Sequence, residues 1–378
     1  MRSMAVKYLY LDDESPDKIQ GYIRAVERES DTGLEIERIP PRRYDRQVEA
    51  IRNLPEDVDG VILDFRLDMK SNEIEGEKEG ASYRAASIAQ EIRSLGTEGK
   101  IEETPLVLWS LSRRYKESYS PDETAHDLFD LTSTKDKLGE TEGAQKMATR
   151  LVSLANGYNE LRRIIDENRK RKRFTYKLLG LEENPDFLDQ RIVTYFDNQS
   201  ALPIHEYARF ILREVLAHTR PLVDEAVLAA RLGVDNKKSE DWGGLLDQLE
   251  QVRYGGPFRE GWPRWWWSRI GDWWKSEVSE ESLKRLSAEA RVERLSEELG
   301  LDDLVAAEPI EEEYSTRFWT VCESYGDPLA LTDGLRAQAR NLEPWMDKPY
   351  ISKKAALLRK GEVDPLDDAR LQRLKRRS

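Results

Sequence analysis

Residues 8–14 have the sequence YLYLDDE, a run of aromatic and apolar residues that ends in three acids. A continuous apolar run, as opposed to an alternating one, is typical of a strand buried on both faces of a parallel sheet. Two further runs end in polar residues: residues 61–64 (VILD) end at Asp64, and residues 105–110 (PLVLWS) end at Ser110. A run at residues 128–132 (LFDLT) precedes Lys135. These segments predict the strands of one buried sheet.

Helical patterns alternate with the strand patterns in the first ~140 residues, which is the arrangement of a doubly wound α/β fold. Residues 34–39 complete a predicted five-stranded parallel sheet, and the helical patterns lie at residues 16–29, 46–54 and 82–95. Ligands of such folds bind at the carboxyl ends of the strands. The acids and Ser110 lie at those ends.

Length and charge bound the remaining possibilities. The chain has 378 residues, which indicates two or three domains, and a net charge of −13, which disfavours nonspecific binding to nucleic acid or anionic lipid. Cys322 is the single cysteine, so no intrachain disulfide or multi-cysteine metal site can form, and a reducing cytoplasm is expected. No apolar stretch approaches the ~20 residues of a membrane span, so no membrane association is expected.

Residues 5–140 resemble the receiver domain of response regulators, the phospho-accepting half of two-component signalling. The resemblance rests on the order of Asp12, Asp13, Asp64, Ser110 and Lys135 along the chain. It implies a flavodoxin-like fold in which Asp64 accepts a phosphoryl group. Asp13 would bind Mg²⁺ directly, Asp12 would support the metal through water, and Asp64 would complete the site. Ser110 would hydrogen-bond the phosphoryl oxygens, Lys135 would pair with them, and a histidine kinase or another phosphodonor would be the partner.

Elementary chemistry supports the same assignment. A carboxylate can act as a covalent phosphoryl acceptor. Mg²⁺ and a lysine neutralise the charge that spreads over the transferred group, and Mg²⁺ prefers one or two carboxylates plus waters and substrate oxygens. Clustered acids repel one another unless a cation is present. We therefore expect Mg²⁺ as the cofactor, and we expect Arg66 to lie beside the phosphoryl group, where it would tune hydrolysis.

Several residues depart from the family's pattern. Asp136 follows the lysine where the family has proline, and Lys137 is an alternative for the lysine role. Thr132 stands three residues before the lysine, where the family has an aromatic switch residue. An acidic loop at residues 68–80 follows Asp64 and is interpreted as a solvated insertion, with a shield or partner contact as the alternative.

The C-terminal part is predicted to be mainly helical. We expect a receiver-like domain at residues 1–140, a helical linker at 141–177 and an effector or interaction region at 178–378. The linker helix, residues 142–173, is interrupted only by Gly157 and ends in the basic run 169–173; it permits either a homodimerising stalk or packing against the first domain. Further helices are predicted at residues 203–218, 222–232, 245–252, 263–277, 280–300 and 314–325.

Residues 222–249 resemble the first half of a helix-turn-helix. The acids of the would-be recognition segment, Asp235, Glu240, Asp241, Asp247 and Glu250, would face DNA phosphates, whose attraction to basic groups dominates affinity. An ordinary helical hairpin is the better interpretation.

A tryptophan-rich segment offers a second candidate surface. On a continuous helix one face would contain Trp262, Trp266, Ile270, Trp273 and Trp274, which predicts a core stripe. Trp265 and Trp267 would point elsewhere, next to Arg264 and Arg269. Because tryptophan and arginine are enriched in interface hot spots, they form either a partner-binding surface or a second packing face; base stacking on single-stranded nucleic acid is a weaker option.

The main hypothesis is a response-regulator-like signalling protein that relays the phosphorylation state of Asp64 to a protein partner through its helical C-terminal region. Alternatives are a DNA-binding regulator using residues 222–249, and a phosphorylation-independent receiver-like scaffold in a multi-protein system such as a defence system. Beyond phosphotransfer and self-dephosphorylation no enzyme is indicated, because the three histidines are scattered and no Gly-rich phosphate loop occurs.

Overall fold

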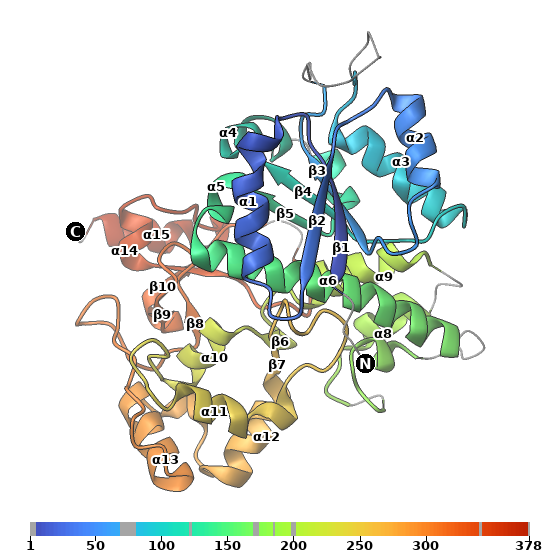
Figure 1. Cartoon of the computed structure of the whole chain (residues 1–378). Coiled ribbons are helices and arrows are strands. Elements are labelled where there is room, and N and C mark those ends of the chain that lie inside the picture. The colour runs from blue at the N-terminus through green and yellow to red at the C-terminus, as the bar shows by residue number, and fades with distance from the viewer. Residues whose placement is uncertain are drawn as a thin grey trace. The chain divides into compact units, whose positions relative to one another are not determined.

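The first ~140 residues fold around one parallel sheet, as Figure 1 shows for the computed structural model. The strands are β1 (Val6–Leu11), β2 (Leu34–Ile39), β3 (Gly60–Asp64), β4 (Leu106–Ser110) and β5 (Leu131–Thr134). Their order is β2-β1-β3-β4-β5 and every neighbouring pair is parallel. This is the flavodoxin-like order of doubly wound folds, so the predicted fold class is confirmed. The structure describes residues 5–68, 81–120, 123–168, 174–183, 186–197, 202–339 and 342–376.

Helices cover both faces of the sheet. Alternate strand residues such as Leu63 and Leu108 pack with α2 (Tyr44–Arg52) and α3 (Ala85–Thr97) on one face. The other face lies against α1 (Pro16–Arg28), α5 (Lys135–Leu138) and α6 (Thr141–Asn168); there Tyr8 donates a hydrogen bond of 2.8 Å to the carbonyl of Leu151 in α6. All residues of β3 and β4 are buried, which is why their sequences are continuous apolar runs.

The fifth strand begins later than predicted. Residues 128–132 were expected to be the strand, but Glu123–Leu128 form a 3₁₀ turn and pairing with β4 starts at Leu131. The carboxylate of Asp130 instead accepts hydrogen bonds from the Arg93 guanidinium and the Leu106 amide, both at 2.8 Å. The strand ends at Thr134, so Lys135 follows it directly. Between β4 and β5 lie α4 (Ser112–Arg114) and a π-helical turn at Tyr115–Tyr119.

The chain forms two compact units, which are described separately. The first contains the described residues up to 183 together with Ile192–Leu212 and Gly256–Trp262; the second contains the remaining described residues. The predicted linker helix is therefore, over Thr141–Asn168, part of the packing of the first unit, as one of its two alternatives proposed.

Gly157 does not interrupt α6, contrary to the prediction. The helix runs through Gly157. The missing side chain allows the buried ring of Phe258, in the same unit, to approach the helix closely: a Cβ at residue 157 would lie 2.2 Å from Cδ1 of Phe258. The predicted basic run 169–173 lies outside the described residues, as does the acidic loop beyond Asp68.

The C-terminal region is mainly helical, as predicted, with short antiparallel strand pairs between the helices. Three helix predictions need correction. Residues 314–325 contain the strand Thr320–Val321 and no helix, and residues at or near the start of the helices predicted at 222–232 and 263–277 instead form a strand pair, Leu222–Val223 with Trp265–Trp266. The helices are α7 (Thr175–Leu178), α8 (Gln190–Asp197), α9 (Ile204–Phe210), α10 (Glu225–Leu232), α11 (Trp242–Gln248), α12 (Trp267–Glu277), α13 (Ala288–Leu299), α14 (Lys353–Leu357) and α15 (Asp368–Lys375). The strand pairs are β6 (Leu222–Val223) with β7 (Trp265–Trp266), β8 (Thr320–Val321) with β9 (Pro328–Leu329), and β10 (Gly334–Arg336) with β11 (Tyr350–Ser352).

Within the described residues, no helix combines the length and apolar character needed to cross a bilayer.

Candidate functional site

The carboxyl edge of the sheet brings four predicted site residues together. Asp12 follows β1, Asp64 ends β3, Ser110 ends β4 and Lys135 is the first residue after β5. Parallel strands end at the same edge, so these residues converge although they are far apart in sequence. All four are buried, with exposed fractions of 0–1 %. Asp13, next to Asp12, is also buried.

Lys135 is the centre of the site. Its Nζ lies 2.8 Å from Oδ1 of Asp64, 2.7 Å from Oδ2 of Asp12 and 3.2 Å from Oε2 of Glu14. The alternative lysine, Lys137, is exposed on α5, which assigns the role at the site to Lys135. Glu14 was not among the predicted site residues, although it continues the acidic run of residues 12–14.

Burial and charge shift the protonation of this cluster. Burial raises the pKa of Asp64 to about 6; the charge of Lys135 opposes the shift and that of Asp12 adds to it. Burial alone would lower the pKa of Lys135, but the charges of Asp64 and Asp12 outweigh it, so the pKa is raised above its usual value. Lys135 is therefore an ammonium at neutral pH, and Asp64 is mostly a carboxylate.

Tyr10 supports Asp12 from the same face of β1. Its hydroxyl donates to Oδ2 of Asp12, whose Oδ1 accepts a 2.7 Å hydrogen bond from the amide of Glu14. Burial, followed by the charge of Asp12, raises the pKa of Tyr10 well above its usual value, so the hydroxyl keeps its proton and acts as a donor. Tyr10 was not among the predicted site residues. Its position two residues before Asp12 on a strand, hence on the same face, was the available signal.

Two arginines lie beside Asp64. The amide of Arg66 donates a 2.9 Å hydrogen bond to Oδ2 of Asp64, while its guanidinium is directed to Asp68, with Nε 2.5 Å from Oδ1. Arg66 therefore contacts Asp64 through its backbone amide, and not through its guanidinium. Nη1 of Arg114, from α4, lies 3.8 Å from Oδ2 of Asp64. No pattern in the sequence pointed to Arg114.

The donor chemistry of the site fits Mg²⁺ only in part. In the part of the chain that the structure describes, no group of three or more His, Cys, Asp or Glu side chains is arranged to hold a metal ion. Mg²⁺ is, however, commonly held by one or two carboxylates together with waters and phosphoryl oxygens. Asp12 already accepts hydrogen bonds from Tyr10, Lys135 and the Glu14 amide, so its oxygens are largely engaged by the protein itself.

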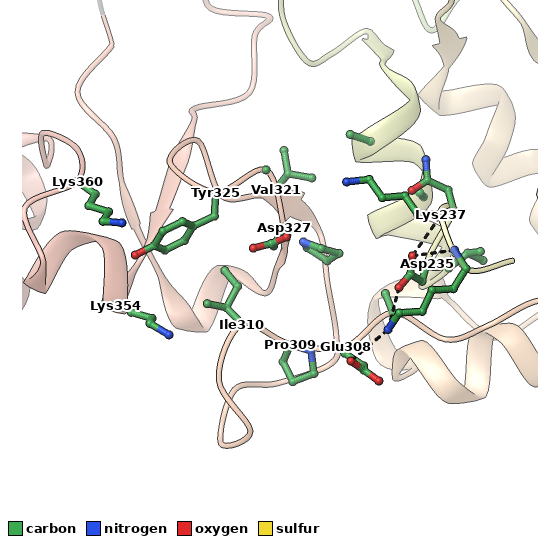
Figure 2. Close-up of a pocket in the computed structure, with 18 of the residues that line it drawn as sticks. Asp235, Lys237, Glu308, Pro309, Ile310, Val321, Tyr325, Asp327, Lys354 and Lys360 are labelled. Atoms are coloured by element: carbon green, nitrogen blue, oxygen red, sulfur yellow. Dashed lines mark hydrogen bonds and ion pairs between the residues drawn. The ribbon is translucent and has the colours of Figure 1, made fainter. Parts of the chain in front are cut away.

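A cavity in the C-terminal unit is another candidate site (Figure 2). This cavity of about 700 Å³ is bordered by lysines from well-separated segments, among them Lys238, Lys354 and Lys360. Lys238 pairs with Asp235 and Glu308, both at 3.4 Å. Lys354 pairs with Glu311, which does not line the cavity, and Lys360 lies over the ring of Tyr325. The lysines are exposed and partly neutralised, so this cavity is a weaker candidate than the strand-end cluster.

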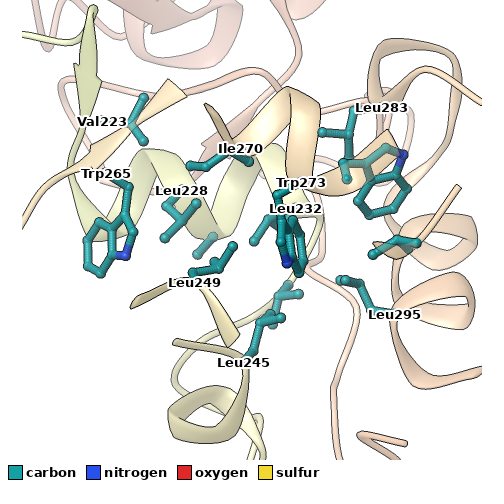
Figure 3. Close-up of a cluster of buried hydrophobic side chains, with 14 of the residues drawn as sticks. Val223, Leu228, Leu232, Leu245, Leu249, Trp265, Ile270, Trp273, Leu283 and Leu295 are labelled. Atoms are coloured by element: carbon teal, nitrogen blue, oxygen red, sulfur yellow. The ribbon is translucent and has the colours of Figure 1, made fainter. Parts of the chain in front are cut away.

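For Trp265 the structure favours the second of the two interpretations, a packing face. The predicted helical stripe is wrong in part, because Trp262 and Trp266 precede the helix that contains Ile270, Trp273 and Trp274. Trp265 was expected to point away from the core stripe, but it is 3 % exposed and packs with Leu228, Leu249 and Ile270 (Figure 3). The helix begins only at Trp267, and Trp265 lies on a strand, so helical periodicity does not apply to it. Trp267 is partly buried against the same core. Trp265 is therefore a packing residue.

The segment that resembles a helix-turn-helix packs into the same core. Leu228 of α10 and Leu245 of α11 are both fully buried there. Residues 233–241 connect the two helices and are longer than the 3–4-residue turn of that motif. This arrangement favours the helical-hairpin interpretation.

Comparison with known proteins adds no assignment. No protein-family model matches the chain, and no curated protein gives a significant match.

Proposed function

We propose that this protein is a response-regulator-like signalling protein that accepts a phosphoryl group on Asp64. The observation that carries the proposal is the contact of 2.8 Å between Asp64 and Lys135 at the carboxyl edge of the sheet, with Ser110 ending the adjacent strand. A buried carboxylate held beside an ammonium and a hydroxyl is suited to accept and retain a phosphoryl group.

The chemistry follows from the residues present. A carboxylate oxygen of Asp64 attacks the phosphorus of a donor such as a phosphohistidine or acetyl phosphate. The new O–P bond forms as the bond to the donor breaks, and the donor leaves with the electron pair. Lys135 compensates the charge on the phosphoryl oxygens, and Ser110 donates a hydrogen bond to one of them. Mg²⁺ bound near Asp13 would supply further neutralisation of that charge.

The proposal extends to the C-terminal region, which would relay the state of Asp64 to a protein partner. A cytoplasmic histidine kinase would be the natural donor. The single cysteine of the chain supports a reducing compartment such as the cytoplasm. The acidic net charge favours a protein over nucleic acid as the partner.

One observation favours a second candidate, a receiver-like scaffold that works without phosphorylation. Asp64 has no exposed surface, and Lys135 already neutralises part of the acidic cluster. A phosphodonor reaches Asp64 only if a covering side chain moves. A site that no donor opens would serve structure alone.

Intact-mass measurement separates the two candidates. The full-length protein is incubated with acetyl phosphate and Mg²⁺, next to Asp64→Ala and the control Asp31→Asn, at an exposed carboxylate. The proposal expects one phosphoryl adduct on the wild type and on Asp31→Asn, and none on Asp64→Ala. An unmodified wild type, or an adduct that persists in Asp64→Ala, would support the scaffold.

A further inference from the structure

Arg114 occupies an unusual position beside the proposed phosphoacceptor. The helix α4 follows β4 after a single residue and places Nη1 of Arg114 at 3.8 Å from Oδ2 of Asp64. The side chain of Arg114 is 26 % exposed, whereas that of Asp64 is fully buried. Nη1 itself is buried and makes no hydrogen bond to any residue that the structure describes. A buried donor without an acceptor costs free energy and calls for an explanation.

The other cations near Asp64 are already engaged. Lys135 contacts Asp12, Asp64 and Glu14, and the guanidinium of Arg66 binds Asp68. A phosphoryl group on Asp64 would add negative charge and three strong acceptor oxygens next to Arg114. Charge-assisted hydrogen bonds have lengths of about 2.7–2.9 Å, so Arg114 would need to move by only ~1 Å to bind such an oxygen.

The residue after Arg114 connects this movement to the surface of the sheet. The hydroxyl of Tyr115 lies 3.3 Å from Oγ1 of Thr132 in β5, and its ring packs against that of Tyr119 with centroids 5.2 Å apart. Tyr115 begins the π-helical turn Tyr115–Tyr119. Such turns are frequent at functional sites, where the backbone has an alternative α-helical hydrogen-bonding pattern. The hydroxyl of an aromatic residue therefore contacts Thr132. That residue, Tyr115, lies after β4 and not at the position three residues before the lysine.

We propose that Arg114 binds the phosphoryl group on Asp64 and that Tyr115 transmits this binding to β5 through Thr132. The inference rests on the proposed function and adds to it two residues with separate roles. Arg114 contacts the phosphoryl oxygens. Tyr115 is a positioning residue, which changes its contact with Thr132 when Arg114 moves.

The test combines adduct lifetime with hydrogen exchange. Wild type, Arg114→Gln, Arg114→Lys and Tyr115→Phe are treated with acetyl phosphate and Mg²⁺, and Arg113→Gln is the matched control, because Arg113 is exposed and pairs only with Glu117 among the described residues. The amount and lifetime of the adduct are measured by intact mass. Amide exchange is followed in peptides that cover residues 111–120 and 129–135.

Arg114→Gln should shorten the adduct lifetime about tenfold, as expected for one lost charge-assisted hydrogen bond. It should also abolish the phosphorylation-dependent change in exchange, and Arg114→Lys should restore part of both. Tyr115→Phe should keep the adduct lifetime but lose the exchange response in residues 129–135. Arg113→Gln should match the wild type.

Equal lifetimes and equal exchange responses for wild type and Arg114→Gln would overturn the role of Arg114 while leaving phosphorylation of Asp64 intact. An unaltered response in Tyr115→Phe would overturn the role of Tyr115. A wild type that forms no adduct at all would overturn the proposed function, and this inference with it.

Discussion

Lys135 Nζ lies 2.8 Å from Oδ1 of Asp64, and both groups are buried. The same ammonium also contacts Asp12 and Glu14, so one positive charge is shared by three carboxylates. The charges of these carboxylates raise the pKa of Lys135 despite its burial. Burial raises the pKa of Asp64, and the shared charge of Lys135 opposes that shift only in part. The contact gives the site a pH dependence that can be measured.

Asp64→Asn should stabilise the protein at neutral pH. The pKa of Asp64 is raised from 3.8 to about 6, so the native state resists its ionisation. At about 1.4 kcal/mol per pH unit, the variant should gain up to about 3 kcal/mol above pH 6. Because the folded-state pKa is raised, the wild type has the corresponding stability below pH 4 and loses it as the pH rises through 6. Urea unfolding at pH 4 and pH 8 measures the difference, with exposed Asp31→Asn as control. An equal effect of Asp64→Asn at both pH values would contradict the prediction.

Lys135→Met should destabilise the protein strongly. It leaves Asp12 and Asp64 buried without their cation, and breaking a buried ion pair from one side typically costs about 3–5 kcal/mol. Lys137→Met, two residues away and exposed, should change the free energy of unfolding by less than about 0.5 kcal/mol. Urea titrations of both variants provide the comparison. Similar losses in the two variants would argue against a special role for Lys135.

The rate of phosphorylation should fall at acidic pH. The nucleophile is the carboxylate of Asp64; burial raises its pKa to about 6, and a bound cation would lower that pKa again. The initial rate of adduct formation from acetyl phosphate should therefore fall about tenfold per pH unit below a midpoint at or below 6, and the midpoint should move to lower pH as the Mg²⁺ concentration rises. Intact-mass time courses between pH 5 and pH 8 give the profile. A rate that does not change across this range would show that ionisation of Asp64 does not limit the reaction.

Gly157→Ala should destabilise the first unit. The added Cβ would lie 2.2 Å from the ring of Phe258, and overpacking of this kind costs about 1–3 kcal/mol. Gly271→Ala is the matched control: it also lies within a helix, but no atom is within 4 Å of its added Cβ. That variant should gain about 0.5–1 kcal/mol from helix propensity. Thermal unfolding of the pair distinguishes a steric effect from propensity, and a stabilised Gly157→Ala variant would refute the close approach.

Trp265→Ala should unfold the C-terminal unit more readily, since Trp265 is a core residue. Its side chain is 3 % exposed, and truncation of a buried tryptophan costs about 3–5 kcal/mol. Leu366→Ala, at a side chain that is 69 % exposed, should change stability by less than about 0.5 kcal/mol. Denaturant midpoints of the two variants test this. A Trp265→Ala protein as stable as the wild type would return Trp265 to the candidates for a partner surface.

Much of the fold was predictable because its signals are local. The runs ending at Leu11, Asp64 and Ser110 are largely continuous and apolar, a pattern typical of strands that are buried on both faces of a parallel sheet. The later start of β5 was not predictable from the local pattern, since the side chain of Asp130 pairs with Arg93 of α3, a residue remote in sequence. The strand at Trp265–Trp266 was missed for a similar reason: its partner, Leu222–Val223, is remote in sequence.

The sheet and the polar residues at its carboxyl edge could be predicted from the sequence, because strand patterns and strand ends are encoded within a few neighbouring residues. Three features required the folded structure: which lysine enters the site, the support from Tyr10 and Glu14, and the position of Arg114 beside Asp64. Those outcomes depend on side chains from separate elements that meet in one buried volume. In that volume, the pairing of the groups depends on burial and charge and not on the local sequence pattern.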